Sequence, residues 1–425
     1  MSTFTRSFNR RQAIGLGAAV AATAGTGVLL PRRTFAQETV NITWATWGGA
    51  AQAQLYTQAI ELFHAAQDTI RVSNINSPDF EAHNQRTLTN AAGGNPADIV
   101  MQPGELLANY AAQGVFEPVS SLAANDSDWS VDDYFENPIG AMTWNDEVWG
   151  LPKDFNVNAL YFNKNAFEEA GLALPTSDWT WDDLLTNAQA LTSRDGARVE
   201  RYGWSDGGIA PWQWVWQNGA EIFDQYQDPT EVLLTDPAAV EALTYYFNLF
   251  TEEKVAPSPS ELTQAGGRQE LFMAGRTAML YDHRGATVPF AQITNFEWDI
   301  VEMAHNVERG GTLAFSGFCV SSGSQQKEAA WEFVKWLTGV DGVSVFVGGG
   351  NALPALKAAA ELPELAVQEP FRNAVDYSRV VIQSQRYAEI APIISTEFES
   401  VILGNETAEQ AATNLKDKLE PIFNS

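Results

Sequence analysis

Tryptophan beside turn residues is the feature of this chain with the clearest chemical use. The sequence has 14 Trp residues, and several stand next to turn residues; among them, Trp47 precedes Gly48 and Gly49, and Trp212 follows Pro211. A sugar ring has an apolar C–H face and a rim of hydroxyls, so its site needs flat aromatic surfaces among polar side chains. Loops are also where binding residues collect. These aromatics therefore suit a carbohydrate ligand.

The alternative is that most of these tryptophans lie in the core, as large apolar side chains usually do. Trp331 and Trp336 belong to a helical pattern and fit that interpretation best. Trp204, Trp214 and Trp216 crowd around a segment rich in glycine, which is typical of a loop. The sequence alone leaves both interpretations open.

Patterns typical of metal and nucleotide sites are missing. None of the four histidines has a second histidine at H-x-x-x-H or H-E-x-x-H spacing, and a single cysteine cannot form C-x-x-C. The chain also lacks a P-loop and the G-x-G-x-x-G fingerprint. A glycosidase needs only two carboxylates, and 53 acidic residues leave that possibility open. We expect a protein that is not an enzyme and has no cofactor and no metal.

The N-terminus has the composition of an export signal. Arg10 and Arg11 precede a weakly apolar Gly/Ala run to Leu30, and a second basic pair leads to Ala36. The paired arginines and the mild hydrophobicity resemble a twin-arginine leader. We expect cleavage near Ala36 and a soluble, periplasmic or extracytoplasmic mature protein. A membrane anchor is the alternative, but this run is short and rich in Gly and Thr.

The chain is strongly acidic and has one cysteine. Loss of five leader arginines would change the net charge from −28 to about −33. Such charge excludes nucleic acid as a partner. With one cysteine no internal disulfide forms, so stability must come from burial. Cys319 lies in an apolar run and is expected to be a core thiol. We expect a monomer.

Strands and helices are expected to alternate in the first part of the mature chain. Residues 40–44 predict a strand, 55–66 an amphipathic helix, and 70–75 and 97–101 two further strands. This β-α-β-α-β order predicts a parallel sheet.

Helices are expected to dominate the later part. A strand at 159–162 precedes a helix at 181–192 behind Thr180, and another helix starts at Pro237. A capping box at 407–410 opens the last helix. A chain of 425 residues is expected to form two lobes. Because no linker divides the sequence, we expect the lobes to be interwoven.

Several short motifs occur in the order of one known family. They are NPADIV at 95–100, GVFEPV at 114–119, VWGLP at 148–152, LYFNK at 160–164, WTWDDL at 179–184, LFMAGRTAM at 271–279, AAWEF at 329–333, LPA at 353–355 and LGN at 403–405. Together they resemble the extracellular solute-binding proteins of family 1, the group that includes maltose-binding protein. The chain departs from the family at 281–285, where members often place a Trp and this sequence has YDHRG.

The resemblance implies an α/β fold of the two-lobed periplasmic-binding-protein type II class, with parallel-sheet lobes joined by a hinge of three crossings. Mapping the family's crossings gives one lobe of 37–155 plus 300–338 and another of 159–296 plus 340–425. It also implies capture of a sugar or oligosaccharide in the cleft between the lobes, by closure, for the membrane permease subunits of an ABC importer. The alternatives are a binder of a charged solute, such as glycerol phosphate, a polyamine or ferric ion, and a secreted carbohydrate-active enzyme.

The residues expected in the site follow from the family pattern and from the loops at the carboxyl ends of parallel strands. The first lobe is expected to supply Trp47 as a stacking surface, with Gln102 and Glu105 as hydrogen-bonding groups. The remaining candidates are Asp154, Asn156, Trp212, Asp282, His283, Arg284, Ser316, Gly317 and Asn351. For His283 and Arg284 the alternative is a local ion pair with Asp282.

Overall fold

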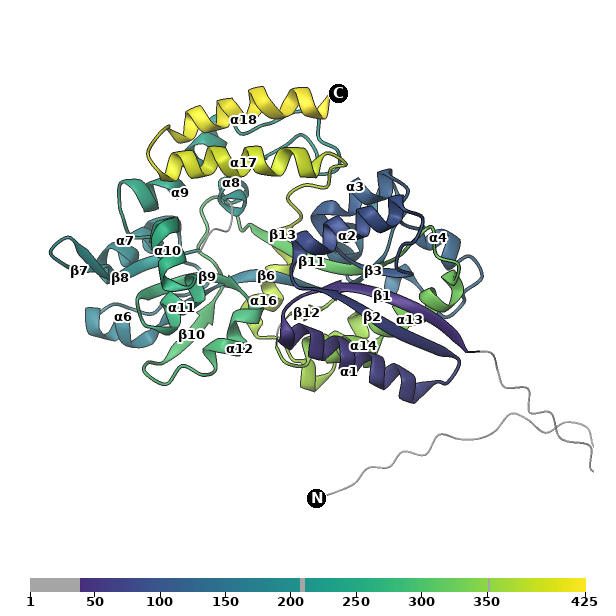
Figure 1. Ribbon diagram of the computed structural model, residues 1–425. Helices are drawn as coiled ribbons and strands as arrows, with labels where there is room; N and C mark the ends of the chain where they lie inside the picture. The colour runs from purple at the N-terminus through teal and green to yellow at the C-terminus, as the bar shows by residue number, and fades with distance from the viewer. Residues whose placement is uncertain (1–38, 207–210, 351) are drawn as a thin grey trace, which may run out of the picture. The chain divides into compact units, whose positions relative to one another are not determined.

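The computed structural model describes residues 39–206, 211–350 and 352–425 (Figure 1). The expected leader and Asn351 lie outside the described residues. Residues 39–425 form one compact unit. None of the helices in the described ranges is long and apolar enough to cross a membrane.

The strands join into one large sheet and a small hairpin. The strands are β1 (Val40–Trp47), β2 (Ile70–Ser77), β3 (Ile99–Pro103), β4 (Thr143–Trp144), β5 (Glu147–Val148), β6 (Leu151–Asn163), β7 (Ser193–Asp195), β8 (Arg198–Ser205), β9 (Thr277–His283), β10 (Trp298–Val301), β11 (Gly311–Val320), β12 (Leu353–Pro354) and β13 (Ser378–Arg379).

Helices cover this sheet. The α-helices are α1 (Ala50–Ala66), α2 (Phe80–Ala92), α3 (Leu107–Ala112), α4 (Val119–Leu122), α5 (Glu136–Ala141), α6 (Lys164–Ala170), α7 (Trp181–Leu191), α8 (Trp212–Gln217), α9 (Pro237–Thr251), α10 (Pro259–Ala265), α11 (Arg268–Met273), α12 (Thr287–Phe290), α13 (Lys327–Thr338), α14 (Val340–Val347), α15 (Lys357–Ala360), α16 (Glu369–Ala374), α17 (Tyr387–Ile402) and α18 (Ala408–Phe423). Figure 1 shows α17 and α18 side by side.

The large sheet is mixed, whereas the sequence predicted a parallel one. Its order is β2-β1-β3-β11-β6-β9-β8-β7, with β10 and β12 also pairing β6 and β13 pairing β11. The expected parallel pairing holds for β1 with β2 and β3, and for β8 with β9. Strand β6 runs antiparallel to β9, β10, β11 and β12, and β11 also runs antiparallel to β3, whereas its short pairing with β13 is parallel. The expected parallel order holds in the βαβ unit where α1 connects β1 to β2. Strands β6 and β11 instead pair across more than 150 residues of chain, which the local βαβ pattern does not specify.

Strand β6 holds the two halves of the sheet together. Its first part, Leu151 to Val157, pairs with β11, and its second part, Asn158 to Phe162, pairs with β9. Most of its residues are buried on both faces. A strand with two buried faces has a near-continuous apolar sequence, and the run from 157 to 162 has that character.

Buried side chains form two hydrophobic cores. The first core contains β1, β3, β11 and α13, and the second contains α7, α8, α9, α17 and α18. The chain changes from one core to the other within β6, between Ala304 and Leu313, and between Ala374 and Ile382. One group from the second half of the sheet, including Phe272, Leu280 and Phe290, also belongs to the first core. Each lobe therefore takes residues from separate parts of the chain.

Helix α14 packs in the first core, although the expected lobe division places it in the second lobe. That division assigned 340–425 to the second lobe, yet α14 contacts α1 and α13, and its Val343 and Phe346 belong to the first core. The lobe boundaries themselves stay a prediction.

The local signals in the sequence are confirmed in several elements. Capping boxes at Thr180 and Thr407 open α7 and α18, and Pro237 occupies the first turn of α9. Cys319 is buried in β11, and burial raises the pKa of its thiol. It is a core residue, as its apolar surroundings in the sequence predicted.

Candidate functional site

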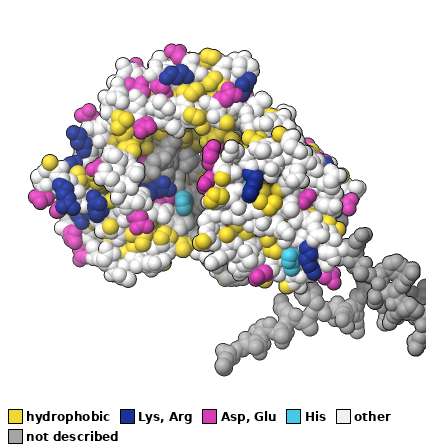
Figure 2. Space-filling view, viewed as in Figure 1, with side chains coloured by type: hydrophobic (Ala, Val, Ile, Leu, Met, Phe, Trp, Pro, Cys, Tyr) yellow, Lys and Arg dark blue, Asp and Glu magenta, His cyan; other side chains and the backbone are white. Residues whose placement is uncertain are grey.

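A cavity of about 290 Å³ lies where β11, the segment before α17 and α17 itself come together. Both cores contribute to its walls: Leu313 and Phe315 belong to the first core, and Trp212 and Ile382 to the second. The lining residues are Glu105, Trp212, Thr312, Leu313, Ala314, Phe315, Val380, Val381, Ile382, Tyr387, Ala391, Ile394 and Ser395. Figure 2 shows the surface hollowed next to the helices at the top of the view. We call this cavity the cleft.

Glu105 is the only charged residue among those that line the cleft. It follows β3 directly and lies in a single turn of 3-10 helix, Gly104–Leu106. The side chain is half-buried, and burial raises the pKa of its carboxyl. No described residue forms an ion pair with it, and its own backbone N–H is the donor that lowers its pKa in part. This carboxylate is therefore free to accept hydrogen bonds from a ligand.

Tyr387, the first residue of α17, also lines the cleft, and the turn that contains Glu105 contacts this helix. Burial, together with the negative charge of Glu105, raises the pKa of the Tyr387 hydroxyl to about 12. The hydroxyl therefore stays protonated at neutral pH and can donate a hydrogen bond.

Trp212 supplies an aromatic wall. It is the first residue of α8 and is 7% exposed. Its ring packs edge-on against Phe398, with centroids 5.1 Å apart, and more loosely against Phe223 at 6.4 Å. Trp212 also lines the cleft. It is thus held in place by the second core at the wall of the cleft.

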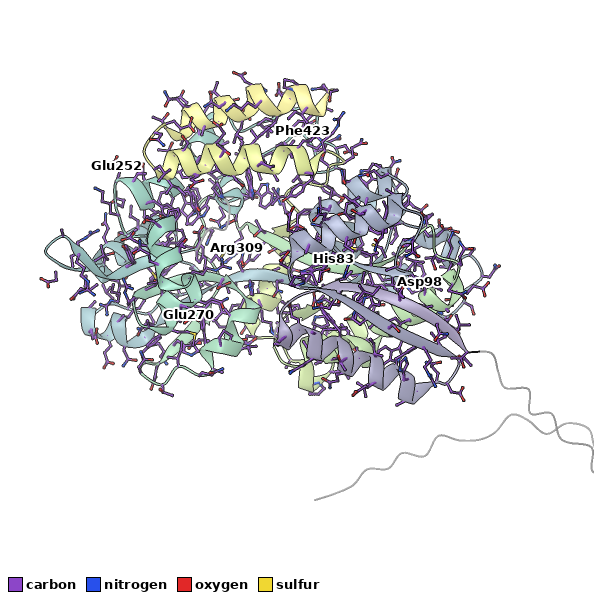
Figure 3. The ribbon with its side chains drawn as sticks, viewed as in Figure 1. His83, Asp98, Glu252, Glu270, Arg309 and Phe423 are labelled. Carbon is purple, nitrogen blue, oxygen red and sulfur yellow. The ribbon has the colours of Figure 1, made fainter. Side chains whose placement is uncertain are left out.

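Trp47 lies at the end of β1 and does not line this cavity. It is partly exposed, and its ring contacts Phe80 at 5.6 Å and His83 at 4.9 Å between centroids. His83, labelled in Figure 3, is buried, and its Nε2 lies 2.8 Å from the carbonyl oxygen of Met101. The Tyr56 hydroxyl donates to the Trp47 carbonyl at 2.8 Å. These contacts fix the Trp47 ring on the first core.

Asp154 and Ser316 meet between β6 and β11. The two residues are register partners, and the Ser316 hydroxyl donates to Asp154 at 3.3 Å. Lys153 forms an ion pair with the same carboxylate at 2.9 Å. Tyr56 lies near enough that Asp154 helps raise the pKa of its hydroxyl, after the larger effect of burial. The structure thus brings Asp154 and Ser316 together, and Tyr56, which contacts the Trp47 carbonyl, feels the charge of Asp154.

Gln102 and Asn156 carry buried oxygens without a partner. Gln102 is fully buried, its Nε2 donates to the Pro103 carbonyl at 3.2 Å, and its Oε1 has no donor in the described part of the chain. The Asn156 Oδ1 is likewise without a donor there. Both oxygens lack solvent contact, so a ligand would reach them only after a local rearrangement.

Gly317 has a packing role. It pairs with Gln102 of β3, and a Cβ at this position would lie 2.6 Å from both the Leu151 carbonyl oxygen and the Met142 side chain. A larger residue cannot fit between these strands. Close approach of β6 and α5 therefore accounts for the glycine.

Asp282 is the centre of a buried ion pair. It has no exposed surface, and it accepts hydrogen bonds from Arg268 Nε at 3.0 Å, Arg268 Nη2 at 2.9 Å and Gln269 at 2.9 Å. Burial alone would raise the pKa of Asp282, but the hydrogen bonds and charge of Arg268 outweigh it and lower the pKa. The His283 Nε2 lies 3.6 Å from the same carboxylate. Burial lowers the pKa of the His283 imidazole, which favours its neutral form. The ion pair with Asp282 is therefore made by Arg268, which sequence reasoning missed.

Arg284 is buried and points away from Asp282. Its guanidinium donates to the carbonyls of Ala352 and Ala366 and to the Gln368 side chain. Burial lowers the pKa of this guanidinium. The three acceptors lie 68 to 84 residues away in the chain, so Arg284 ties the turn after β9 to the segments around β12 and α16.

Hydrogen bonds connect two of the segments in which the chain passes from one core to the other. Arg309, labelled in Figure 3, donates to Glu302 at 2.8 Å, and Asn373 donates to the same carboxylate at 2.9 Å. The Tyr377 ring lies under the Arg309 guanidinium at 6.0 Å. These contacts join the segment before β11 to the segment after α16.

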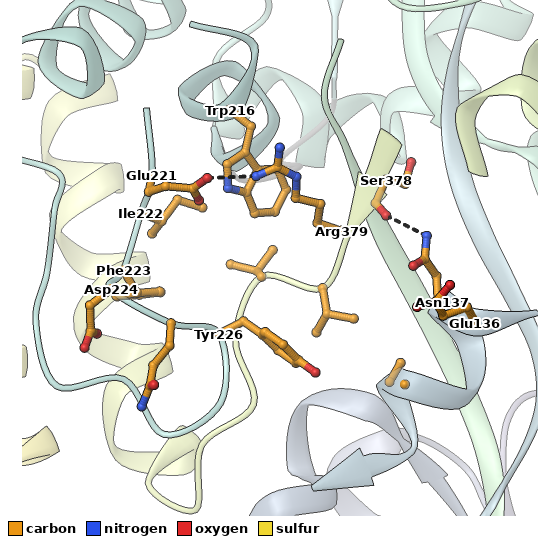
Figure 4. A pocket seen from close by; sticks show the side chains of 15 residues that line it. Glu136, Asn137, Trp216, Glu221, Ile222, Phe223, Asp224, Tyr226, Ser378 and Arg379 are labelled. Carbon is orange, nitrogen blue, oxygen red and sulfur yellow. Dashed lines mark hydrogen bonds and ion pairs between the residues drawn. The ribbon is translucent and has the colours of Figure 1, made fainter. Parts of the chain in front are cut away.

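A second cavity, of about 560 Å³, lies on the other side of Val380 and Val381. Figure 4 shows Arg379 against the Trp216 ring, with Glu221 bound to its guanidinium. Arg379 forms ion pairs with Glu221 at 2.9 Å and Glu308 at 3.6 Å and lies 5.6 Å from the Trp216 centroid. Its cation is thus neutralised by protein groups, which makes this cavity a weaker candidate for binding than the cleft.

Sequence reasoning placed Glu105 and Trp212 in the site, and the structure brings these two residues to one cavity. It missed Phe315 of β11 and the α17 face made of Tyr387, Ala391, Ile394 and Ser395. The spacing of 4, 7 and 8 residues along α17 marks one helix face and could have been found in the sequence.

The described residues show no arrangement for metal or serine chemistry. They contain no group of three His, Cys, Asp or Glu side chains that could hold a metal ion. The string from Gly203 to Gly207 has G-x-S-x-G spacing. However, Ser205 lies inside β8, pairs with Leu280 and is 1% exposed. A nucleophile elbow instead presents its serine at a turn between a strand and a helix.

Comparison with known proteins finds a family whose sequence profile matches most of this chain. The sequence profile described as bacterial extracellular solute-binding protein matches residues 39–343. The fold is similar to that of an ABC substrate-binding protein from Listeria monocytogenes in complex with cycloalternan, with a TM-score of 0.82 and 26% identity, covering 91% of this chain and 100% of that one.

Two curated relatives are similar in sequence. The mannitol-binding protein of Pseudomonas aeruginosa is 23% identical over 75% of this chain and 76% of its own length. The erythritol/L-threitol-binding protein of Mycolicibacterium smegmatis is 24% identical over 61% of this chain and 59% of its own length.

Proposed function

We propose that this protein, which belongs to the bacterial extracellular solute-binding protein family, captures a sugar or polyol in the cleft and delivers it to an ABC importer. Members of this family bind solutes and are not enzymes. The importer, the sugar and the cleft are the parts that we propose.

The composition of the cleft carries this proposal. Trp212, Phe315 and Tyr387 give it flat aromatic surfaces, and Glu105, Thr312 and Ser395 give it polar groups. Aromatic rings stack on the C–H face of a sugar, and a carboxylate accepts hydrogen bonds from its hydroxyls. The Listeria relative holds an oligosaccharide, and two curated relatives are named for sugar alcohols. These ligands share the hydroxyl-rich chemistry that the cleft suits.

Closure is the proposed mechanism of capture. The cleft takes walls from both cores, so a ligand that contacts Glu105 on one side and Trp212 on the other would favour the conformation in which the two sides are closest. Trp47, Asp154 and Ser316 on the first core would add contacts as the cleft narrows. The remaining sequence candidates, Gln102, Asn156, Asp282, His283, Arg284, Gly317 and Asn351, are kept as a proposal for the wider site.

The N-terminal leader is the basis for the proposed export and location of the protein. A twin-arginine export signal cleaved near Ala36 would release a soluble monomer into the periplasm or another extracytoplasmic space. Its partners would be the transmembrane subunits of the importer.

Ligand binding with closure can be tested in one experiment. The mature protein is screened by thermal melting against neutral disaccharides, oligosaccharides and sugar alcohols, and each solute that stabilises it is followed by small-angle scattering. We expect stabilisation of at least about 2.7 kcal/mol at one hundred times Kd and a smaller radius of gyration. Stabilisation with release of cleaved sugar would favour an enzyme, and an unchanged radius of gyration would contradict closure.

Trp212→Ala is expected to weaken binding of a solute found in that screen by about 1–3 kcal/mol, because the ligand loses its aromatic contact. Titration calorimetry measures the affinity, and a thermal melt shows how much of the variant is folded. Trp216→Ala, on the same helix but lining the second cavity, is the matched control and should keep its affinity. Equal losses in both variants would place the ligand elsewhere.

A further inference from the structure

We propose that Glu105 makes the cleft selective by charge, so that it accepts neutral polyols and sugars and rejects their anionic derivatives. This inference rests on the proposed function, and it chooses between the neutral and the charged solutes that the sequence left open. It makes Glu105 a specificity-determining residue and not only a contact.

The cleft contains no group that could neutralise an anion. Its lining residues include no Lys, Arg or His, and Glu105 is their single charge. A phosphate or carboxylate on a ligand would leave water without gaining a cationic partner, which is unfavourable in a partly buried site. The negative charge of Glu105 would add repulsion.

Several basic side chains around the site candidates are already bound to protein acceptors, including Arg386, which precedes Tyr387 and pairs with Glu389 at 3.0 Å. Arg268 pairs with Asp282 at 2.9 Å, Lys153 with Asp154 at 2.9 Å, and Arg379 with Glu221 at 2.9 Å. Arg284 is buried among two carbonyls and the Gln368 side chain. An anionic ligand would have to break one of these arrangements to obtain a counter-charge.

The start of α17 is the one feature of the cleft that could favour an anion, since helix N-termini carry partial positive charge. Its first-turn groups are largely occupied. The Tyr387 N–H donates to the Ser384 carbonyl at 3.0 Å, and the Glu389 N–H donates to the Arg386 carbonyl at 2.9 Å. Glu389 in this turn forms an ion pair with Arg386 at 3.0 Å, so these two charges offset each other. The helix end therefore does not offset Glu105.

Hydroxyl groups, by contrast, can donate the hydrogen bonds that the Glu105 carboxylate is able to accept. Among the described residues it has no cationic partner, and a carboxylate can accept hydrogen bonds at several lone pairs. A hydrogen bond from a hydroxyl to an ionised acceptor is about twice as strong as one between neutral groups. A neutral polyol can supply such donors without bringing a charge.

The test compares three forms of one ligand in three proteins. A neutral sugar or sugar alcohol that stabilises the wild-type protein is paired with its phosphate ester and its carboxylate derivative. Affinities are measured by calorimetry for wild type, Glu105→Gln and Glu136→Gln. Glu136 is exposed and lines the second cavity, so its variant removes the same charge at a distance from the cleft. Thermal melts confirm that each variant is folded.

We expect wild type to prefer the neutral form by at least about 100-fold. Glu105→Gln should reduce that preference by about tenfold or more, and Glu136→Gln should leave it unchanged. Equal or tighter binding of the phosphate ester by wild type would overturn the charge filter while leaving solute binding intact. An unchanged preference in Glu105→Gln would overturn the role of Glu105. If neutral solutes fail to bind and anionic ones succeed, or if neither class binds, both the filter and the proposed sugar function are wrong.

Discussion

Trp214→Ala is expected to lower the free energy of unfolding by about 3–5 kcal/mol, as truncation of a buried tryptophan does in other cores. Trp214 is fully buried in the second core. Its ring lies 5.4 Å from Trp181, 5.8 Å from Trp204 and 5.8 Å from Tyr281, measured between centroids. Removal of the indole would leave a large cavity among rings that are themselves held by other contacts, so the site has little freedom to collapse.

Urea unfolding followed by far-UV circular dichroism measures this loss. The matched variant is Trp47→Ala, since Trp47 is partly exposed and should cost less stability. Trp214→Phe should recover part of the loss because it keeps one aromatic ring. A change below about 1 kcal/mol for Trp214→Ala would contradict the packing described here.

The tryptophans show where sequence reasoning reached its limit. Trp204, Trp214 and Trp216 were interpreted as possible loop residues because glycines lie between them, yet they are 0%, 0% and 3% exposed. Trp212 to Gln217 form a helix of only 6 residues, which is too short to show a 3.6-residue period. Trp331 was expected in the core and is 4% exposed. The sequence left core and loop open for Trp204, Trp214 and Trp216, and their burial agrees with the core interpretation. Trp204 lies in β8, and the other two lie in the short helix.

Longer elements were predictable from local signals. The helices α7, α9 and α18 have caps or proline at their starts and apolar faces that repeat at helical spacing. Strand pairing was harder, because β6 and β11 join the sheet across more than 150 residues of chain. Their antiparallel direction depends on contacts that no local pattern encodes.

The cleft combines residues that are distant in the sequence. Glu105, Trp212, Phe315 and Tyr387 come from four separate segments, and only the first two were predicted. Each was predicted from its position after a strand or beside a turn. Phe315 and Tyr387 enter the cleft because β11 and α17 pack beside these segments, which is a property of the whole fold.

Arg268→Met is expected to destabilise the protein by about 3–5 kcal/mol at about pH 7, because it leaves the buried Asp282 carboxylate without its cation. Asp282 is fully buried, and Arg268 gives it two hydrogen bonds. Arg268 also lies near enough to the buried Asp206 for that carboxylate to help raise its pKa. The variant would therefore leave two acidic groups in the interior with less compensation. Arg201→Met is the control: Arg201 pairs at 3.1 Å with Glu169, which is 67% exposed, and such surface pairs contribute about 0–1 kcal/mol.

The pH dependence separates loss of charge from loss of packing. In the wild type the pKa of Asp282 is lowered, so its contribution to stability is present above the unfolded pKa of about 4 and is lost as pH falls through the folded value. In Arg268→Met, burial would raise the pKa of Asp282, and protonation would relieve the variant as pH falls. The difference between the two proteins should therefore shrink between about pH 7 and about pH 4, measured by urea unfolding at each pH. A difference that stays constant over this range would assign the effect of Arg268 to packing of its side chain, and the buried ion pair would then contribute nothing to stability.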